Sequence, residues 1–148
     1  MYTHILVATD GSDVAERSLT HGLALARSLN AQVTIITVTE PYPIYADGNY
    51  GIVSGETLID GYEESQDEIA NSILAAAQKV AKSVGPQVET VHLANTHPAE
   101  AIIREANSRN CDLIVVGSHG RRGVGRLLLG SKTWEVVAQS QVPVLVVR

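Results

Sequence analysis

The chain has 148 residues, 45% of them hydrophobic, and this length and composition predict one globular domain over residues 1–148 and exclude a disordered chain. The chain has a single cysteine, which excludes an intramolecular disulfide. It has no apolar run of the roughly 20 residues that cross a membrane, which excludes a membrane partner. With no signal-peptide pattern either, we expect a cytoplasmic protein. Residues 1–100 carry −9 and residues 101–148 carry +4, and the resulting net charge of −5 argues against a nucleic-acid partner, because an acidic chain repels a phosphate backbone.

Strand and helix patterns alternate along the whole chain. Short apolar runs predict strands, and apolar residues spaced three or four positions apart predict helices. The expected elements are, in order, a strand at 4–9, a helix from the turn at 10–12 to about residue 29, a strand at 32–38, a helix at 57–84, a strand at 88–93, a helix beginning at Pro98, a strand at 113–116, a helix at 133–139 and a strand at 144–147. Asn30 is expected to end the first helix in the left-handed conformation, and Cys111, beside an apolar strand, is expected to be a small buried residue.

The connection at 39–56 is longer than usual and carries Tyr42, Tyr45 and Tyr50. It leaves the second strand at its carboxyl end. Stacking of one of these rings on a bound base and packing of the rings onto the protein surface both remain open.

Alternating strands and helices with unbroken apolar strands predict an α/β fold, namely a doubly wound five-stranded parallel sheet of the Rossmann-like type with helices on both faces. Right-handed crossovers limit such sheets to a few strand orders, among which the residues do not decide. Ligands of such sheets bind beyond the carboxyl ends of the strands, where the winding reverses.

The strongest functional pattern is the stretch GSHGRRGVGRLLLGSKT at 117–133. It follows an apolar strand, contains five glycines and four basic residues, and ends with Ser131 and Thr133 where a helix is expected. Glycines let backbone N–H groups approach a ligand, and a helix N-terminus favours an anion. The stretch therefore predicts a phosphate cradle formed around Gly117, Gly120 and Gly130, and a small polyphosphate suits it better than DNA or RNA.

Two common phosphate-binding motifs do not match this stretch. A Walker A loop needs Lys directly after its second Gly, and Ser131 stands there instead. A GxGxxG fingerprint starting at Gly123 fails because Leu128 takes the place of its third Gly. Turn glycines flanked by solvated arginines remain the structural alternative.

Asp10 lies at the predicted end of the first strand. A carboxylate close to a polyphosphate is repelled unless a divalent cation lies between them, so Mg²⁺ or Mn²⁺ at Asp10 is expected. Capping of the first helix is the equally weighted alternative. His119, inside the cradle, is a candidate contact, whereas the other histidines, cysteines and carboxylates have neither zinc-site spacing nor a triad pattern.

The spacing Gly117-x2-Gly120-x9-Gly130-Ser131 resembles the nucleotide-binding signature of the universal stress protein family. The likeness continues in the opening ILVATDGS, in PAEAI after the third strand and in the closing VPVLVVR. It implies a strand order of 3-2-1-4-5 and ATP, an adenine nucleotide, bound between Asp10 and Gly117. The residues it implies are Ala8, Thr9 and Asp10 beside the nucleotide, Val38 at the adenine, Val116, Gly117, His119 and Gly120 around the ribose and phosphates, and Gly130, Ser131 and Thr133 at the phosphates. Lys132 departs from the family pattern, and either adds a phosphate contact or crowds the site.

The last strand, at 144–147, is predicted to be an edge strand because Pro143 at its start lacks a backbone donor. An unbroken apolar edge is an aggregation hazard unless a partner covers it. We expect Val144 and Val146 to pair with the same strand of a second copy, as the family resemblance suggests, and a covering helix is the alternative.

Together with these patterns, the family resemblance implies an ATP-binding universal stress protein that acts as a dimeric regulator in the stress response. The alternatives are a slow ATPase or nucleotidyl-transfer enzyme, and a dimeric interaction module that binds a cyclic nucleotide or none. Since the cradle has no carboxylate of its own to orient a water molecule, we expect hydrolysis to be slow or absent.

Overall fold

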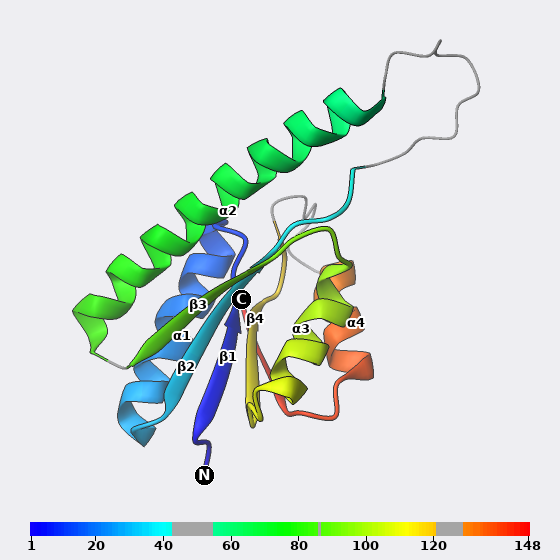
Figure 1. Ribbon diagram of the computed structural model, residues 1–148. Helices are drawn as coiled ribbons and strands as arrows, with labels where there is room; N and C mark the ends of the chain where they lie inside the picture. Colours follow the sequence, from blue (N-terminus) through cyan, green and yellow to red (C-terminus); the bar gives the residue numbers. More distant parts are fainter. Residues whose placement is uncertain (43–54, 86, 121–128) are drawn as a thin grey trace.

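The computed structural model describes residues 1–42, 55–85, 87–120 and 129–148, with side chains from residue 59 onward in the second of these segments. These residues form five strands and four helices in alternation (Figure 1). The strands are β1 (His4–Ala8), β2 (Gln32–Val38), β3 (Val88–Leu93), β4 (Leu113–Gly117) and β5 (Val144–Val147), and the helices are α1 (Asp13–Leu29), α2 (Gly55–Val84), α3 (Pro98–Ser108) and α4 (Ser131–Gln139). The predicted elements are confirmed, with ends that differ by one or two residues.

The five strands form one parallel sheet in the order β3-β2-β1-β4-β5. Helices α1 and α2 cover one face of this sheet, and α3 and α4 cover the other (Figure 1). The predicted doubly wound α/β fold and the strand order implied by the family resemblance are therefore confirmed. The chain moves outward from β1 to β3 and then crosses back to β4 on the other side of β1, so the winding reverses between the carboxyl ends of β1 and β4.

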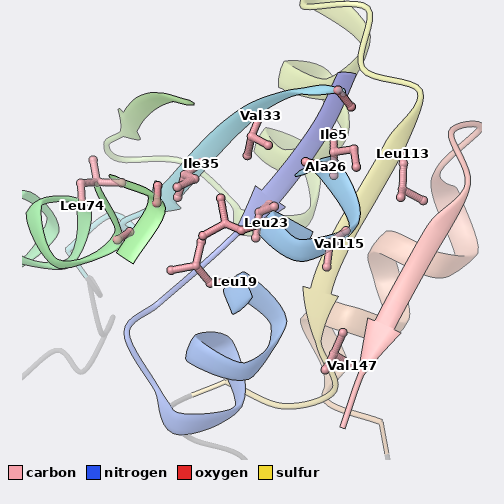
Figure 2. Close-up of a cluster of buried hydrophobic side chains, with 14 residues drawn as sticks. Ile5, Leu19, Leu23, Ala26, Val33, Ile35, Leu74, Leu113, Val115 and Val147 are labelled. Carbon is pink, nitrogen blue, oxygen red and sulfur yellow. The ribbon is translucent and has the colours of Figure 1, made fainter. Parts of the chain in front are cut away.

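The core has two layers because the central strands are apolar on both faces. Ile5 and Val7 of β1 belong to a buried cluster with Leu19 and Leu23 of α1 and with residues of α2. Figure 2 shows this cluster, with Ile5, Leu19 and Leu23 labelled. Leu6, between them in the sequence, points to the opposite layer under α3 and α4. Full burial of one such side chain contributes about 1.5–3 kcal/mol, so the sheet is a stable base from which the loops at its carboxyl end project.

Two sequence predictions about helix ends and cysteine chemistry are confirmed. Asn30 ends α1 in the left-handed conformation, with φ 54°. Cys111 is buried, and this burial raises the pKa of its thiol to about 11, which keeps the thiol protonated and unreactive near neutral pH. In the part of the chain that the structure describes, none of the helices is both long enough and apolar enough to cross a membrane.

Candidate functional site

A crevice of about 790 Å³ opens at the carboxyl end of the sheet, where the winding reverses. It brings together every predicted site residue that the structure describes. These are Ala8 at the end of β1, Thr9 and Asp10 after it, Val38 at the end of β2, Val116, Gly117, His119 and Gly120 around the end of β4, and Gly130, Ser131, Lys132 and Thr133 at the start of α4. The remaining members of the predicted cradle, Gly123, Gly125, Arg121, Arg122 and Arg126, lie outside the described residues.

A second hollow, of about 680 Å³, lies on the outer side of α3 and contains none of the predicted site residues. Its lining comes from α3 and from Gln139 of α4. Since none of its lining residues belongs to the loops that directly follow β1 or β4, where the winding reverses, we take the crevice as the candidate site.

The start of α4 supplies the part of the crevice that suits an anion. Gly130 is the N-cap residue and offers no side-chain cap, and the first turn contains no acidic residue. The N–H of Trp134 donates to the Gly130 carbonyl at 2.8 Å, so the N–H groups of Ser131, Lys132 and Thr133 precede the first bond of the helix and have no acceptor within it. This helix end therefore presents backbone donors and a positive dipole to the crevice.

The sequence placed the start of this helix at Thr133, two residues too late. Its apolar pattern begins near Val136, which is buried, whereas the first turn is polar and carries no apolar periodicity. The difference matters because it makes Gly130 the cap and places Ser131 and Lys132 inside the first turn.

At two positions glycine is required because neighbouring atoms lie too close for a side chain, and not because φ is positive. A Cβ on Gly130, whose φ is −59°, would lie 3.2 Å from the Ser118 carbonyl oxygen and 3.4 Å from the Cα of His119. A Cβ on Gly120 would lie 2.9 Å from Oδ2 of Asp10. Side chains at these positions would fill the space between the two loops, which is the space that the glycine spacing predicted for a ligand.

Asp10 stands opposite Gly120, at the exit of β1. Its Oδ1 accepts a hydrogen bond from the N–H of Ser12 at 3.0 Å, across a turn in which Gly11 has φ 74°. The helix cap is Ser12, whose Oγ accepts from the N–H of Ala15 at 3.3 Å. The alternative prediction, that Asp10 caps α1, is therefore wrong, and the Asp10 carboxylate lies at the crevice instead.

The described residues contain no group of three or more His, Cys, Asp or Glu side chains that could hold a metal ion by themselves. Mg²⁺ is commonly held by one or two carboxylates together with phosphate and water oxygens. The single carboxylate at Asp10 fits that type of site, in which a bound polyphosphate supplies the remaining ligands.

Thr133 and His119 contribute polar groups on the α4 side and the β4 side of the crevice. The Thr133 hydroxyl donates to the Gly117 carbonyl at 2.8 Å, so we expect its phosphate contact to come from the backbone N–H. Nδ1 of His119 lies 3.0 Å from Oγ of Ser118, while Nε2 is buried without a hydrogen-bond partner among the described residues. An unsatisfied buried polar atom costs about 1–3 kcal/mol, and a ligand oxygen at Nε2 would remove that cost.

Several lining residues were not predicted from the sequence. Those with polar side chains include Thr39 and Glu40 after β2, and Tyr62 and Gln66 of α2. Tyr62 contacts Tyr42 edge to face, with ring centroids 5.2 Å apart and an interplanar angle of 83°. Tyr42 therefore supports the ring that lines the crevice. The other two tyrosines for which base stacking or surface packing was left open, Tyr45 and Tyr50, lie outside the described residues.

Lys132 takes a position that the sequence did not predict. Its Nζ lies 3.0 Å from Oε1 of Glu40 and 2.8 Å from Nε2 of His97. The side chains of Lys132 and Glu40 are 42% and 45% exposed, so their ion pair lies at the rim of the crevice and not at its floor.

The universal stress protein family model matches residues 1–148. The chain belongs to the universal stress protein family. It is 35% identical over 149 residues to universal stress protein YxiE of Bacillus subtilis, with 100% of each chain covered. The structure of universal stress protein UspA from Lactobacillus plantarum superposes with a TM-score of 0.82 at 27% identity, covering 99% of this chain and 98% of that one.

A further similar structure is that of a universal stress protein in complex with cAMP, with a TM-score of 0.70 and 28% identity over 99% of this chain and 97% of that chain. The family membership inferred from the Gly117, Gly120 and Gly130 spacing is thus confirmed over the whole chain.

Proposed function

We propose that this universal stress protein binds ATP in the crevice and acts in the cytoplasm as a dimeric regulator of the stress response, whose nucleotide state is recognised by partner proteins. The observation that carries the proposal is the uncapped start of α4, which lines the crevice beside Gly117 and Gly120. A helix end of this kind gains most from a multiply charged anion.

The rest of the crevice suits the other parts of a nucleotide. Its apolar lining includes Ile36, Val38, Ile102 and Val116, which form a surface for a planar base. On the polar side, the Asp10 carboxylate would hold Mg²⁺ or Mn²⁺ together with the phosphates. When bound, the metal would neutralise phosphate charge next to the carboxylate.

A cyclic nucleotide is the second candidate ligand. The observation in its favour is the similar family structure that was solved in complex with cAMP. Both candidates contain adenine and phosphate, so both would use the same apolar surface and the same helix start. They differ in how many negative charges the start of α4 receives.

We propose binding and signalling in preference to rapid ATP hydrolysis. The two carboxylates that line the described part of the crevice already have partners: Asp10 accepts from the Ser12 N–H, and Glu40 pairs with Lys132. Fast phosphoryl transfer needs a group that is available to orient the attacking water.

The test is to identify the nucleotide that the protein carries and to measure its affinity. Mass spectrometry of material released from the purified protein is expected to show ATP, and calorimetry is expected to show binding of one ATP per chain. Release of cAMP with tighter binding of cAMP than of ATP would instead support the second candidate. If no nucleotide is released and calorimetry shows binding of neither ATP nor cAMP, the proposed function is wrong.

The dimer is proposed to form through β5, which is an edge strand of the sheet. Leu145 on this strand is 37% exposed, and Trp134 and Val137 on the adjoining helix α4 are 60% and 45% exposed. Pairing of β5 with the same strand of a second copy would satisfy its free backbone groups and cover apolar surface. Val144 and Val146 pack partly against the core beneath α3 and α4. They would therefore hold β5 in place while it pairs with the second copy.

Sedimentation at micromolar concentration tests the dimer. The wild-type protein is expected to sediment as a dimer, and Val146→Lys is expected to sediment as a folded monomer, with circular dichroism confirming the fold. Val80→Lys, at an exposed position on α2, is the matched control and is expected to remain dimeric. A wild-type protein that is already monomeric at this concentration would refute the proposed dimer.

A further inference from the structure

At the rim of the crevice, four polar side chains form a connected group that nucleotide binding as proposed above does not use. Lys132 Nζ lies 3.0 Å from Glu40 Oε1 and 2.8 Å from His97 Nε2, and His97 Nε2 lies 3.4 Å from Glu135 Oε2. Glu40 follows β2, His97 precedes α3, and Lys132 and Glu135 belong to α4. The group therefore ties the start of α4 to the β2 side of the crevice.

The Lys132–Glu40 pair is weak because both side chains are close to half exposed. Exposed ion pairs of this kind contribute little to stability, since water screens them and both side chains lose conformational freedom. A polyphosphate carries several negative charges, whereas Glu40 carries one. An anion bound at the start of α4 would therefore compete successfully with Glu40 for the ammonium group.

The contact with His97 also leaves a polar group unsatisfied. An ammonium group has only donors, so Nε2 of His97 must accept from Lys132 and the ring proton must lie on Nδ1. Nδ1 is buried and has no hydrogen-bond partner among the described residues. If Lys132 moved away, Nε2 could carry the proton and donate to Glu135 instead. Within the described part of the chain, Nδ1 has no partner in either tautomer, so departure of Lys132 exchanges one partner of Nε2 for another and costs the His97 ring little.

Lys132 is also placed to reach a phosphate chain. It lies in the first turn of α4, two residues after the cap Gly130, and its flexible four-carbon stem can turn from Glu40 toward an anion held by that turn. A single phosphate can be satisfied by the backbone N–H groups of the turn itself. Additional phosphates extend beyond those donors and leave negative charge for a side-chain cation.

We propose that Lys132 makes this chain discriminate nucleotides by their number of phosphates, and that Glu40 is the built-in competitor that holds Lys132 in the nucleotide-free protein. A di- or triphosphate takes the ammonium from Glu40, whereas a monophosphate or a cyclic phosphate does not. This inference rests on the proposed function, because it concerns the same crevice and the same helix start.

The experiment measures the affinities of ATP, ADP, AMP and cAMP for four forms of the protein: wild type, Lys132→Met, Glu40→Gln and the double variant. Lys132→Met is expected to weaken ATP binding about tenfold and to change AMP binding less than about twofold. Glu40→Gln is expected to tighten ATP binding about threefold with AMP unchanged, because the competitor is gone. The double variant is expected to behave like Lys132→Met, since Glu40 acts through Lys132.

Lys79→Met and Glu68→Gln, at exposed positions on α2, are the matched controls for charge and are expected to change no affinity. The inference is overturned if Lys132→Met weakens ATP and AMP equally, or if Glu40→Gln weakens ATP binding. In either case nucleotide binding itself, and so the proposed function, would stand.

Tripolyphosphate, which has no base, tests the role of Lys132 independently of adenine-nucleotide binding. Binding of tripolyphosphate that falls about tenfold in Lys132→Met would support the inference even if adenine nucleotides failed to bind and the proposed function were wrong. Wild-type protein that binds neither the nucleotides nor tripolyphosphate would overturn both.

Discussion

Helices α1 and α4 begin at the same end of the sheet, next to the same crevice, yet their first turns are completed in opposite ways. At α1, Ser12 caps the helix with its side chain, and Asp13 and Glu16 place negative charge in the first turn. At α4, Gly130 offers no side chain, the first turn has no acid, and Lys132 adds a positive charge.

This difference shows that position in the fold does not alone decide where an anion binds. Both helices follow strands that flank the reversal of winding, and both have a positive dipole end there. In α1 the chain satisfies that end itself, and the result is a stable start for a helix that packs on the core. In α4 no side chain of the cap residue completes that end, and we propose that a ligand does so. Changes to the two helix starts should therefore separate folding stability from ligand affinity.

The largest effect is expected for Gly130→Val, which removes the opening at the start of α4. The new side chain would meet the Ser118 carbonyl and the backbone of His119, where even a Cβ has only 3.2 Å and 3.4 Å of room. We expect ATP affinity measured by calorimetry to fall about 100-fold, or about 3 kcal/mol. Gly61→Val is the control, because a Cβ on Gly61 meets no atom within 4 Å. Unchanged ATP affinity in folded Gly130→Val would show that ATP does not bind at the start of α4.

Much of the α1 side of this comparison could be predicted from the sequence. The turn at Asp10, Gly11 and Ser12, the helix that follows and its end at Asn30 are all local patterns of capping residues, apolar spacing and a left-handed terminator. The capping role offered as an alternative for Asp10 was wrong, because Asp and Ser cap helices about equally well and a local pattern does not separate them. The structure decides for Ser12 because the Asp10 side chain closes the preceding turn.

The α4 side was predicted less completely. The glycine spacing marked the cradle, but the partners of Lys132 are Glu40 and His97, which are distant in the sequence and are brought close only by the strand order. Tyr62 lines the crevice because of how the long helix α2 lies on the sheet, and no local pattern encodes that. The strand order itself came from the family resemblance, since apolar strands do not specify their neighbours.

Ser131→Asp would make α4 resemble α1 by placing an acid in its first turn. The negative charge of the new Asp interacts favourably with the positive end of the helix dipole, so we expect the free energy of unfolding to rise by about 0.5 kcal/mol. It also repels a phosphate at the same place, so we expect ATP affinity to fall about tenfold. Ser72→Asp, on the exposed side of α2, is the control for added charge. If stability and ATP affinity both rose or both fell, the proposed contrast between the starts of α1 and α4 would be contradicted.

Asp10→Asn tests what the α1 side contributes to the ligand. Asn keeps an oxygen that can accept from the Ser12 N–H, so the turn is expected to survive and only the charge is lost. We expect ATP affinity in Mg²⁺ to fall about fivefold, while affinity in EDTA stays equal or rises because a repulsive charge is gone. Equal losses in Mg²⁺ and in EDTA would show that Asp10 does not act through a metal.

The smallest effect on the ligand is expected for Ser12→Ala, which removes the cap of α1 but leaves α4 unchanged. The Ser12 Oγ accepts from the Ala15 N–H, and loss of such a cap typically costs about 1 kcal/mol of folding stability. Because the N–H groups of α1 are not the ones proposed to hold phosphate, we expect ATP affinity to change less than about twofold. Denaturant unfolding and calorimetry on the same sample measure both quantities. A large loss of ATP affinity with little loss of stability would place the phosphates at α1, and the assignment of structural and ligand-binding roles to the two helix starts would have to be reversed.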